Sequence, residues 1–184
     1  MSNACHHLFQ TALGTCGVAW TDRGLIALQF PEKDPRTTER RLAARVGSAA
    51  AAPPPWVASL IADIQRYLAG EPVDFSSIPV DLEGCDDFRR KLYEALRRIG
   101  FGRTTTYGAL ARDLGLAGWE GAREVGSAMG RNPVPIVIPC HRVLAAGGRL
   151  GGFSAPGGAS TKRKLLVLEG VIVDEDAPPR LPGL

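Results

Sequence analysis

The sequence has no hydrophobic run that approaches the length of a membrane span. Its first residues lack the basic start and apolar stretch of a secretory signal. Its four cysteines, at positions 5, 16, 85 and 140, are scattered and show no disulfide-framework spacing. We therefore expect a cytoplasmic protein with no membrane contact, in which the cysteines are free thiols.

The sequence also lacks the paired-ligand spacing of a zinc site. Cys5, His6, His7 and Cys16 are the candidates, but His6 and His7 are consecutive and no second ligand pair follows them. Residues 1–84 contain no cluster of catalytic residue types either. We predict no bound metal, and we expect any chemistry to reside in the second half of the chain.

The 184 residues suit one large domain or two small ones, and 45% of them are hydrophobic, which is enough for a substantial core. The net charge of +3 is unevenly distributed. Residues 85–170 hold 14 Lys and Arg against 7 Asp and Glu, whereas residues 1–84 hold 7 against 9. This asymmetry favours a polyanionic partner for the second half. The alternative is a generic solvated basic surface.

The first part of the chain predicts a small α+β domain, residues 1–82. Residues 15–30 indicate a hairpin with a turn at 22–24, so the sheet is built on that hairpin. A short helix is expected over 38–45 and a loop over 49–55. Apolar residues at helical spacing predict a second helix from Val57 to Leu68, ended by Gly70 and followed by a linker at 71–84.

The second part, residues 83–173, predicts a mostly helical domain, and residues 174–184 a flexible tail. A helix capped by Asp86 or Asp87 should bury a stripe over 88–99. Thr106 can cap a short helix over 107–114, and a Gly-containing turn leads to a helix over 119–130. This pair has the pattern of a helix-turn-helix, whose second helix docks on DNA. A last helix is expected over 160–169.

The most informative stretch is 139–143, PCHRV, which follows the apolar run Ile136–Ile138. A sulfur nucleophile needs a base to generate the thiolate and positive surroundings to stabilise it. His141 and Arg142 are residues of the types that supply both beside Cys140. The alternative interpretation is a buried inert Cys140 that serves only as core packing.

Further motifs occur in a fixed order around this stretch: TTYGALA at 105–111, GAREVGSAMG at 121–130, RNPVP at 131–135, GFS at 152–154 and LLVLEG at 165–170. In this order and spacing the chain resembles the O6-alkylguanine-DNA alkyltransferases, the methylated-DNA–protein-cysteine methyltransferases. The detailed resemblance covers about residues 88–170. A weaker one covers the N-terminal part.

The resemblance implies a catalytic role for five residues. Cys140 matches the alkyl acceptor, His141 the base that acts through a bridging water, and Glu169 the carboxylate that orients the imidazole. Asn132 matches the side chain that braces the turn before the active site. Tyr107 matches the phenol that assists the departing guanine at N3. No cofactor is implied, because a thiolate and a good leaving group suffice.

The resemblance also implies a substrate pocket and a DNA-binding face. The pocket lining matches Met129, Pro135, Val143, Phe153 and Ser154. Carbonyls near Cys140 and Val143 are expected to accept from the guanine amino group, and Ser154 to donate its backbone N–H to O6. Phe153 stands where many members have Tyr, and the insertion 155–156 lengthens the next loop. On the DNA face, Arg123 matches the residue that fills the gap of the flipped base. The remaining expected DNA-binding residues are Thr106, Ala122, Gly126, Ser127, Gly130 and Arg131.

From this resemblance we expect a monomeric, single-turnover DNA repair protein. It binds double-stranded DNA through the minor groove, flips the lesion out and transfers the alkyl group of O6-alkylguanine, with O4-methylthymine as a further substrate, irreversibly to Cys140. One alternative is an alkyltransferase-like protein that binds the lesion without transfer; such proteins lack the acceptor cysteine. Two more function classes compete with this interpretation: a thiol hydrolase or redox protein, and a transcription factor that uses the helix-turn-helix alone.

Overall fold

The computed structural model describes residues 4–172, and the tail expected at 174–184 lies outside them. The N-terminal domain is built on a sheet of order β3-β2-β1-β4. Its strands are β1 (Cys5–Thr11), β2 (Gly14–Thr21), β3 (Gly24–Gln29) and β4 (Ala49–Ala50). The predicted hairpin is β2–β3. β1 and β4 were not predicted, and β4 lies inside the expected loop at 49–55, where it pairs in parallel with β1.

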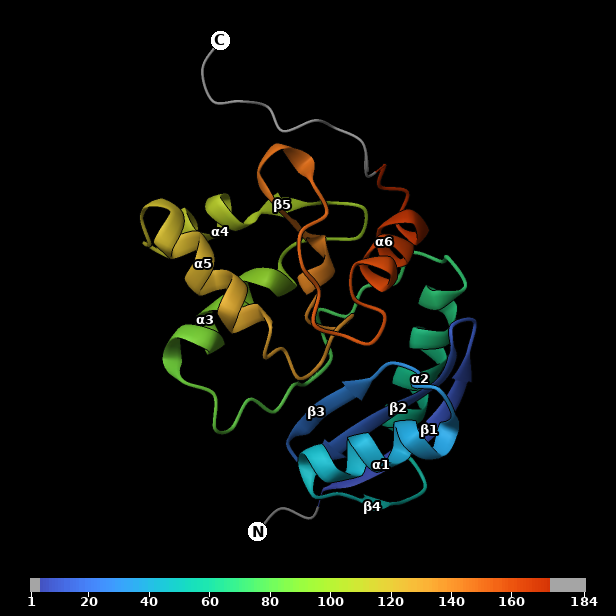
Figure 1. Ribbon diagram of the computed structural model, residues 1–184. Coiled ribbons are helices and arrows are strands. Elements are labelled where there is room, and N and C mark those ends of the chain that lie inside the picture. The colour runs from blue at the N-terminus through green and yellow to red at the C-terminus, as the bar shows by residue number, and fades with distance from the viewer. Residues whose placement is uncertain (1–3, 173–184) are drawn as a thin grey trace.

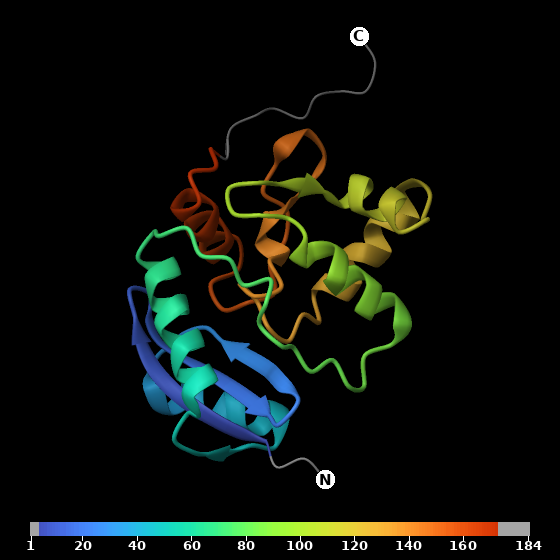
Figure 2. The ribbon, with the colours of Figure 1, turned by 180° about the vertical axis from the view of Figure 1, so that it is seen from behind.

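Two helices, α1 (Pro35–Val46) and α2 (Pro55–Leu68), cover opposite faces of this sheet, α1 in front in Figure 1 and α2 in front in Figure 2. The alternation of side chains along the strands explains the two layers, because neighbouring residues point to opposite faces. Ala19 packs with Leu42 of α1, whereas Val18 belongs to the cluster that contains Leu60 of α2.

The connection between the domains runs along the free edge of β3. The Leu25 N–H donates to the Pro79 carbonyl at 2.9 Å, and the Asp81 N–H donates to the Leu25 carbonyl at 2.9 Å. The Arg23 guanidinium lies 3.0 Å from the Asp81 carboxylate. The linker is thereby fixed to the N-terminal sheet, which places the second domain against β3 and α2.

The C-terminal domain is mostly helical. Its helices are α3 (Asp87–Arg97), α4 (Tyr107–Asp113), α5 (Gly118–Met129), the 3₁₀ turns η1 (Cys140–Arg142) and η2 (Ala146–Gly148), and α6 (Gly158–Leu168). A short parallel pair, β5 (Thr105–Thr106) and β6 (Val143–Leu144), joins the start of α4 to the end of η1. This pair was not predicted, and it draws the helix-turn-helix and the Cys140 turn together.

The predicted caps and helix pair are present. Asp86 accepts from the Arg89 N–H at 2.8 Å, and Thr106 accepts from the Ala109 N–H at 3.2 Å. α5 packs closely on the turn that leads from α4, since a Cβ on Gly121 would lie only 2.7 Å from Leu116, and it also contacts α4, since the same Cβ would lie 3.5 Å from Ala111. Within 88–99, Leu92 and Leu96 are buried, whereas the ends of the expected stripe, at positions 88 and 99, are only half-buried.

The two domains lie side by side and share one core (Figure 1). That core contains Leu60 and Ile64 from α2 together with Leu92 and Leu165 from the C-terminal domain. Burial of this shared apolar surface fixes the domains to each other. Over residues 4–172, no helix is long and apolar enough to cross a membrane.

Candidate active site

Asn132 fixes the turn that leads to Cys140. Its Oδ1 accepts from the Val134 N–H at 3.0 Å, and its Nδ2 donates to the Ile138 carbonyl at 2.8 Å. The same Nδ2 lies 3.1 Å from Sγ of Cys140. One side chain therefore holds both ends of the turn and also contacts the thiol, as the expected bracing role requires.

The turn itself is strained. Ile136 has φ 75°, and it is the only non-glycine residue among those described with a positive φ. Such a conformation costs roughly 1–3 kcal/mol and persists only where the surroundings enforce it. Two hydrogen bonds enforce this conformation: one from Nδ2 of Asn132 to the Ile138 carbonyl, and one from the Ile138 N–H to the Val134 carbonyl at 2.9 Å. The turn therefore holds Cys140 in a fixed position, where the residue is only 6% exposed.

Cys140 rests as a protonated thiol. Burial raises its pKa, and this outweighs the opposite effects of the Asn132 hydrogen bond and of the Lys162 charge. A thiol with a raised pKa is a poor nucleophile at neutral pH. Chemistry at Cys140 therefore requires a base within reach.

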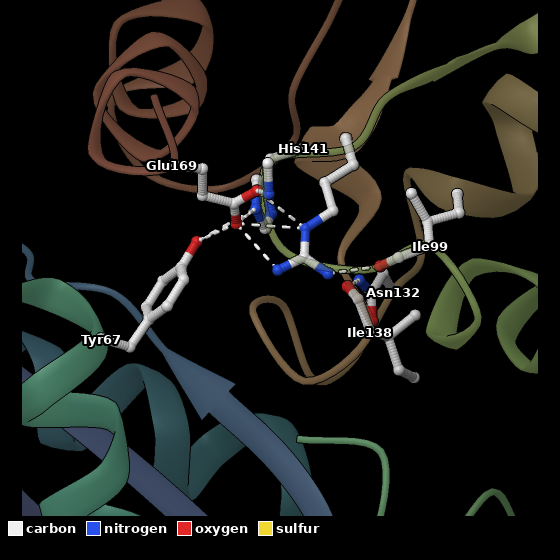
Figure 3. Close-up of polar contacts among 8 residues, drawn as sticks. Tyr67, Ile99, Asn132, Ile138, His141 and Glu169 are labelled. Carbon is white, nitrogen blue, oxygen red and sulfur yellow. Dashed lines mark hydrogen bonds and ion pairs between the residues drawn. The ribbon is translucent and has the colours of Figure 1, made fainter. Parts of the chain in front are cut away.

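His141 is the residue that can act as that base. It is fully buried, and its Nε2 lies 2.8 Å from Oε1 of Glu169 (Figure 3). Burial lowers the pKa of the imidazole, although the Glu169 carboxylate opposes that effect. The ring is thus neutral at pH 7, and its buried Nδ1 has no hydrogen-bond partner among the described groups. The structure brings Cys140, His141, Glu169 and Asn132 together.

Glu169, at the end of α6, accepts from several donors. Gly102 N–H lies 3.0 Å from Oε2, Arg142 Nη2 2.9 Å from Oε1, and the Tyr67 hydroxyl 2.6 Å from Oε1. Burial alone would raise the pKa of this carboxyl, but hydrogen bonds from His141, Arg142 and Tyr67 outweigh it and lower the pKa to about 2. Glu169 is therefore ionised at neutral pH.

The sequence offered Arg142 as a residue of the type that can stabilise a thiolate, and the structure places it on other partners. Its guanidinium does not face the thiol but binds Glu169 and the Ile99 carbonyl (Figure 3). The cation that acts on Cys140 is Lys162, a fully buried residue that sequence reasoning missed. Burial lowers the pKa of Lys162 to about 8. In the sequence, Lys162 lies among other charged residues of a predicted helix, and nothing there indicated that its side chain points into the protein interior.

Tyr67 is the second residue that sequence reasoning missed. It is fully buried on α2 and contacts both Glu169 and His141 from the other domain. The sequence places it on the apolar face of the helix, since it lies three residues after Ile64. That signal identifies a core residue only.

Two cavities meet at Cys140. One, of about 380 Å³, is lined by Tyr107, Gly126, Met129, Gly130, Cys140, Gly152, Phe153 and Ser154. The other, of about 460 Å³, lies toward β3 and α1 and includes Pro135, Ala155 and Pro156. Of the predicted pocket residues, Met129, Phe153 and Ser154 therefore line the first cavity and Pro135 the second.

Val143 does not fit the predicted lining. Its side chain is fully buried, and it lines neither of the two cavities. Its carbonyl, expected to accept from a guanine amino group, accepts from Nζ of Lys162 at 2.6 Å. The parallel pairing of β5 with β6 turns the Val143 side chain into the core.

Tyr107 stands at the wall of the smaller cavity, at the start of α4. Its hydroxyl donates to the Gly152 carbonyl at 3.4 Å, and Nζ of Lys162 lies 5.6 Å from its ring centroid. Gly126 of α5 lies close to this ring, because a Cβ at position 126 would be 3.5 Å from it, in ordinary van der Waals contact. The phenol therefore lies beside the same cavity as the thiol.

The outer face of α5 and the residues after it are open to solvent. Arg123, Ser127, Gly130 and Arg131 are exposed, and Ala122 and Gly126 are half-buried. The Arg123 guanidinium lies 5.9 Å from the ring of Trp119, which is 69% exposed, within the range of a cation–π contact. The Thr106 side chain serves as the cap of α4.

This fold and site define a class of protein: a helix-turn-helix domain that carries a buried Cys-His-Glu site, joined to a small α+β domain. Residues 5–82 match the ribonuclease-like domain of 6-O-methylguanine DNA methyltransferase, and residues 87–171 match its DNA binding domain. The chain belongs to the O6-methylguanine DNA methyltransferase family. The family, the fold class and the enzyme class predicted from the sequence are thereby confirmed.

Individual relatives agree with this assignment. A methylated-DNA–protein-cysteine methyltransferase of Sulfolobus acidocaldarius is 38% identical over 91% of this chain and 94% of its own length. A DNA base-flipping protein of Thermus thermophilus is 44% identical over 59% of this chain and 70% of its own. The crystal structure of Mycobacterium tuberculosis OGT in complex with DNA superposes with a TM-score of 0.73 at 32% identity, covering 90% of this chain and 92% of that one.

Proposed function

We propose that this protein repairs DNA by direct reversal, transferring the methyl or other alkyl group of O6-alkylguanine, and of O4-methylthymine, to Cys140 in a single turnover. One observation carries the proposal. The thiol of Cys140 lies at the wall of a cavity, beside a fully buried imidazole whose Nε2 is held by a carboxylate and whose Nδ1 is free to accept a proton.

The site supplies each group that the displacement needs. His141 accepts the thiol proton at Nδ1 through one bridging water, which also gives that buried nitrogen the partner it requires. The thiolate attacks the alkyl carbon, so that an S–C bond forms and the C–O6 bond breaks. The electron pair leaves on the guanine, where a hydrogen bond from the Tyr107 hydroxyl at N3 stabilises it. The thioether is stable, so Cys140 acts once.

The damaged base can reach this cavity only after it has rotated out of the base stack, since a buried thiol cannot approach the O6 atom of a base that is still stacked in the duplex. The small residues on the outer face of α5 allow a close approach of the DNA backbone in the minor groove. Arg123 is exposed on that face and is placed to occupy the space of the extruded base. The excess positive charge of residues 85–170 supports binding to the phosphates.

Lesion binding without transfer is the second candidate, favoured by the similarity to the Thermus base-flipping protein. The presence of a cysteine at position 140, with a base next to it, favours transfer over binding alone.

A stoichiometric assay distinguishes alkyl transfer from lesion binding without transfer. A duplex oligonucleotide that contains one O6-methylguanine is mixed with increasing amounts of protein, and the remaining O6-methylguanine is measured after digestion to nucleosides. The proposal predicts loss of one lesion per protein molecule and no further turnover with time. Binding in a mobility-shift assay with no loss of lesion would show a lesion-binding protein, and continued turnover would show a true multi-turnover enzyme.

A further inference from the structure

The N-terminal domain contributes one polar group to the His141–Glu169 pair. The Tyr67 hydroxyl, on α2, lies 2.6 Å from Oε1 of Glu169 and 3.1 Å from Nε2 of His141 (Figure 3). Both contacts are fully buried, and they join residues 74 and 102 positions apart in the chain. We propose that Tyr67 is a positioning residue for the transfer reaction, through which the N-terminal domain sets the proton position and the orientation of the catalytic pair. This inference rests on the proposed function.

Packing alone does not require the hydroxyl. The Tyr67 ring makes edge contacts with Phe75, at 5.6 Å between centroids, and with Phe101, at 6.1 Å. A phenylalanine at position 67 would make the same ring contacts. A hydroxyl, in contrast, must be stripped of water to enter this site, which is costly unless it is hydrogen-bonded. The two bonds to the catalytic pair are what the phenol adds over phenylalanine.

The hydrogen bonds of the Tyr67 hydroxyl determine which atoms of Tyr67 and His141 carry protons. Burial and the Glu169 charge raise the pKa of Tyr67, so the phenol stays protonated and donates to Oε1. The phenol oxygen then presents a lone pair toward Nε2 of His141. Nε2 faces two acceptors, Oε1 and the phenol oxygen, and therefore carries the imidazole proton. The lone pair of the ring is thus on Nδ1, the nitrogen on which the proposed base catalysis depends.

The phenol also moderates the charge that His141 experiences. The charged or titratable groups around the imidazole are Glu169 from the end of α6, Lys162 within α6, and Arg142 and Cys140 in η1 beside it. Of the donors to Oε1, Tyr67 makes the shortest bond, at 2.6 Å. Without the Tyr67 hydroxyl, Oε1 of Glu169 keeps more negative charge and attracts the Nε2–H group of His141 more strongly. The imidazolium form is then favoured, so the pKa of His141 rises and a smaller fraction of the rings is neutral and able to accept the thiol proton at neutral pH.

The test is Tyr67→Phe in the full chain, with Phe75→Leu as the control, because Phe75 packs on the same ring but makes no side-chain polar contact with the pair. The rate constant of methyl transfer is measured in single turnover against pH. Tyr67→Phe should slow transfer at pH 7 on the order of 10-fold, as expected for loss of one hydrogen bond to a charged group. The acidic limb of its pH–rate profile should move to higher pH. DNA affinity should be unchanged, and Phe75→Leu should match the wild type in rate and profile.

A double-mutant cycle separates positioning from packing. If Tyr67 acts through Glu169, Tyr67→Phe should add little to the loss caused by Glu169→Gln, whereas independent effects would multiply. A wild-type rate and profile for Tyr67→Phe, or full additivity with Glu169→Gln, would overturn the inference while leaving the proposed function intact. No transfer by the wild type would overturn the proposed function itself.

A measurement on the unaltered protein tests the same inference should Tyr67→Phe not fold. The ¹⁵N chemical shifts of His141 in the wild type report which ring nitrogen carries the proton. We expect the Nε2–H tautomer near neutral pH. A dominant Nδ1–H tautomer would contradict the proton assignment on which the role of Tyr67 depends.

Discussion

Replacing Glu169 by glutamine tests the buried network and the chemistry together. The substitution keeps the shape of the side chain but removes the charge that accepts from His141, Arg142 and Tyr67. The amide presents one oxygen and one NH₂ group where the carboxylate presented two acceptors. The change should therefore leave the Arg142 guanidinium, which is only 6% exposed, without its counter-ion.

The expected cost can be estimated in two ways. Removing one partner of a buried ion pair typically costs about 3–5 kcal/mol. The folded-state pKa of Glu169, about 2 against an ordinary value of 4.5, corresponds to about 3 kcal/mol of stabilisation at neutral pH. Because the folded pKa is depressed, this stability is present above the ordinary value and is lost as the pH falls from about 4.5 toward 2.

The assay is urea unfolding of the wild type and of Glu169→Gln at pH 7 and again near the folded-state pKa of the carboxyl. The stability difference should be about 3–5 kcal/mol at pH 7 and should shrink as the pH falls. Glu94→Gln, an exposed carboxylate on α3, is the control and should change stability little at either pH. A difference that is equal at both pH values, or below about 1 kcal/mol at pH 7, would refute the stabilising role of the buried network. Transfer by Glu169→Gln should also slow by about 10²–10⁴-fold, and an unchanged rate would remove Glu169 from the relay.

Four further substitutions test the remaining roles. Cys140→Ala should abolish transfer but keep binding to methylated duplex in a mobility-shift assay; residual transfer at the wild-type rate would exclude Cys140 as acceptor. Arg123→Ala should slow repair of duplex DNA far more than reaction with free O6-benzylguanine, which needs no flipping, whereas Tyr107→Phe should slow both; equal losses for Arg123→Ala would place that side chain in the fold or pocket instead. Asn132→Ala should destabilise the protein by about 1–3 kcal/mol, because it leaves buried groups of the strained Ile136 turn unpaired. Unchanged thermal stability would contradict the bracing role.

Local patterns predicted the helices of this protein because each has its own signal in the chain. The caps at Asp86 and Thr106 and the apolar spacing from Val57 to Leu68 lie within single elements, and the corresponding helices begin and end within a few residues of the expected positions. β1 was missed because its strand contains the polar pair His6 and His7, which suggested metal ligands instead. Among residues 4–172, no group of three or more candidate ligands is placed to hold a metal ion.

The other features that the sequence did not predict depend on contacts between segments that are far apart in the chain. β4, β5 and β6 contain only two residues each and form only because distant segments meet, so no periodicity marks them. The directions of the Arg142 and Lys162 side chains depend in the same way on where α6 packs. Tyr67 reaches the site only because the shared core presses α2 against the C-terminal domain. Neighbouring residues in the chain do not encode such contacts.

The most direct measurement of the central claim is the mass of the intact protein after incubation with duplex DNA that contains O6-methylguanine, followed by peptide mapping. We predict the gain of one methyl group, located on Cys140, with guanine restored in the DNA. The other cysteines, Cys5, Cys16 and Cys85, should remain unmodified, and Cys16 in particular is held inert because burial raises its pKa to about 11. An unchanged protein mass despite DNA binding, or a methyl group on another residue, would contradict transfer to Cys140.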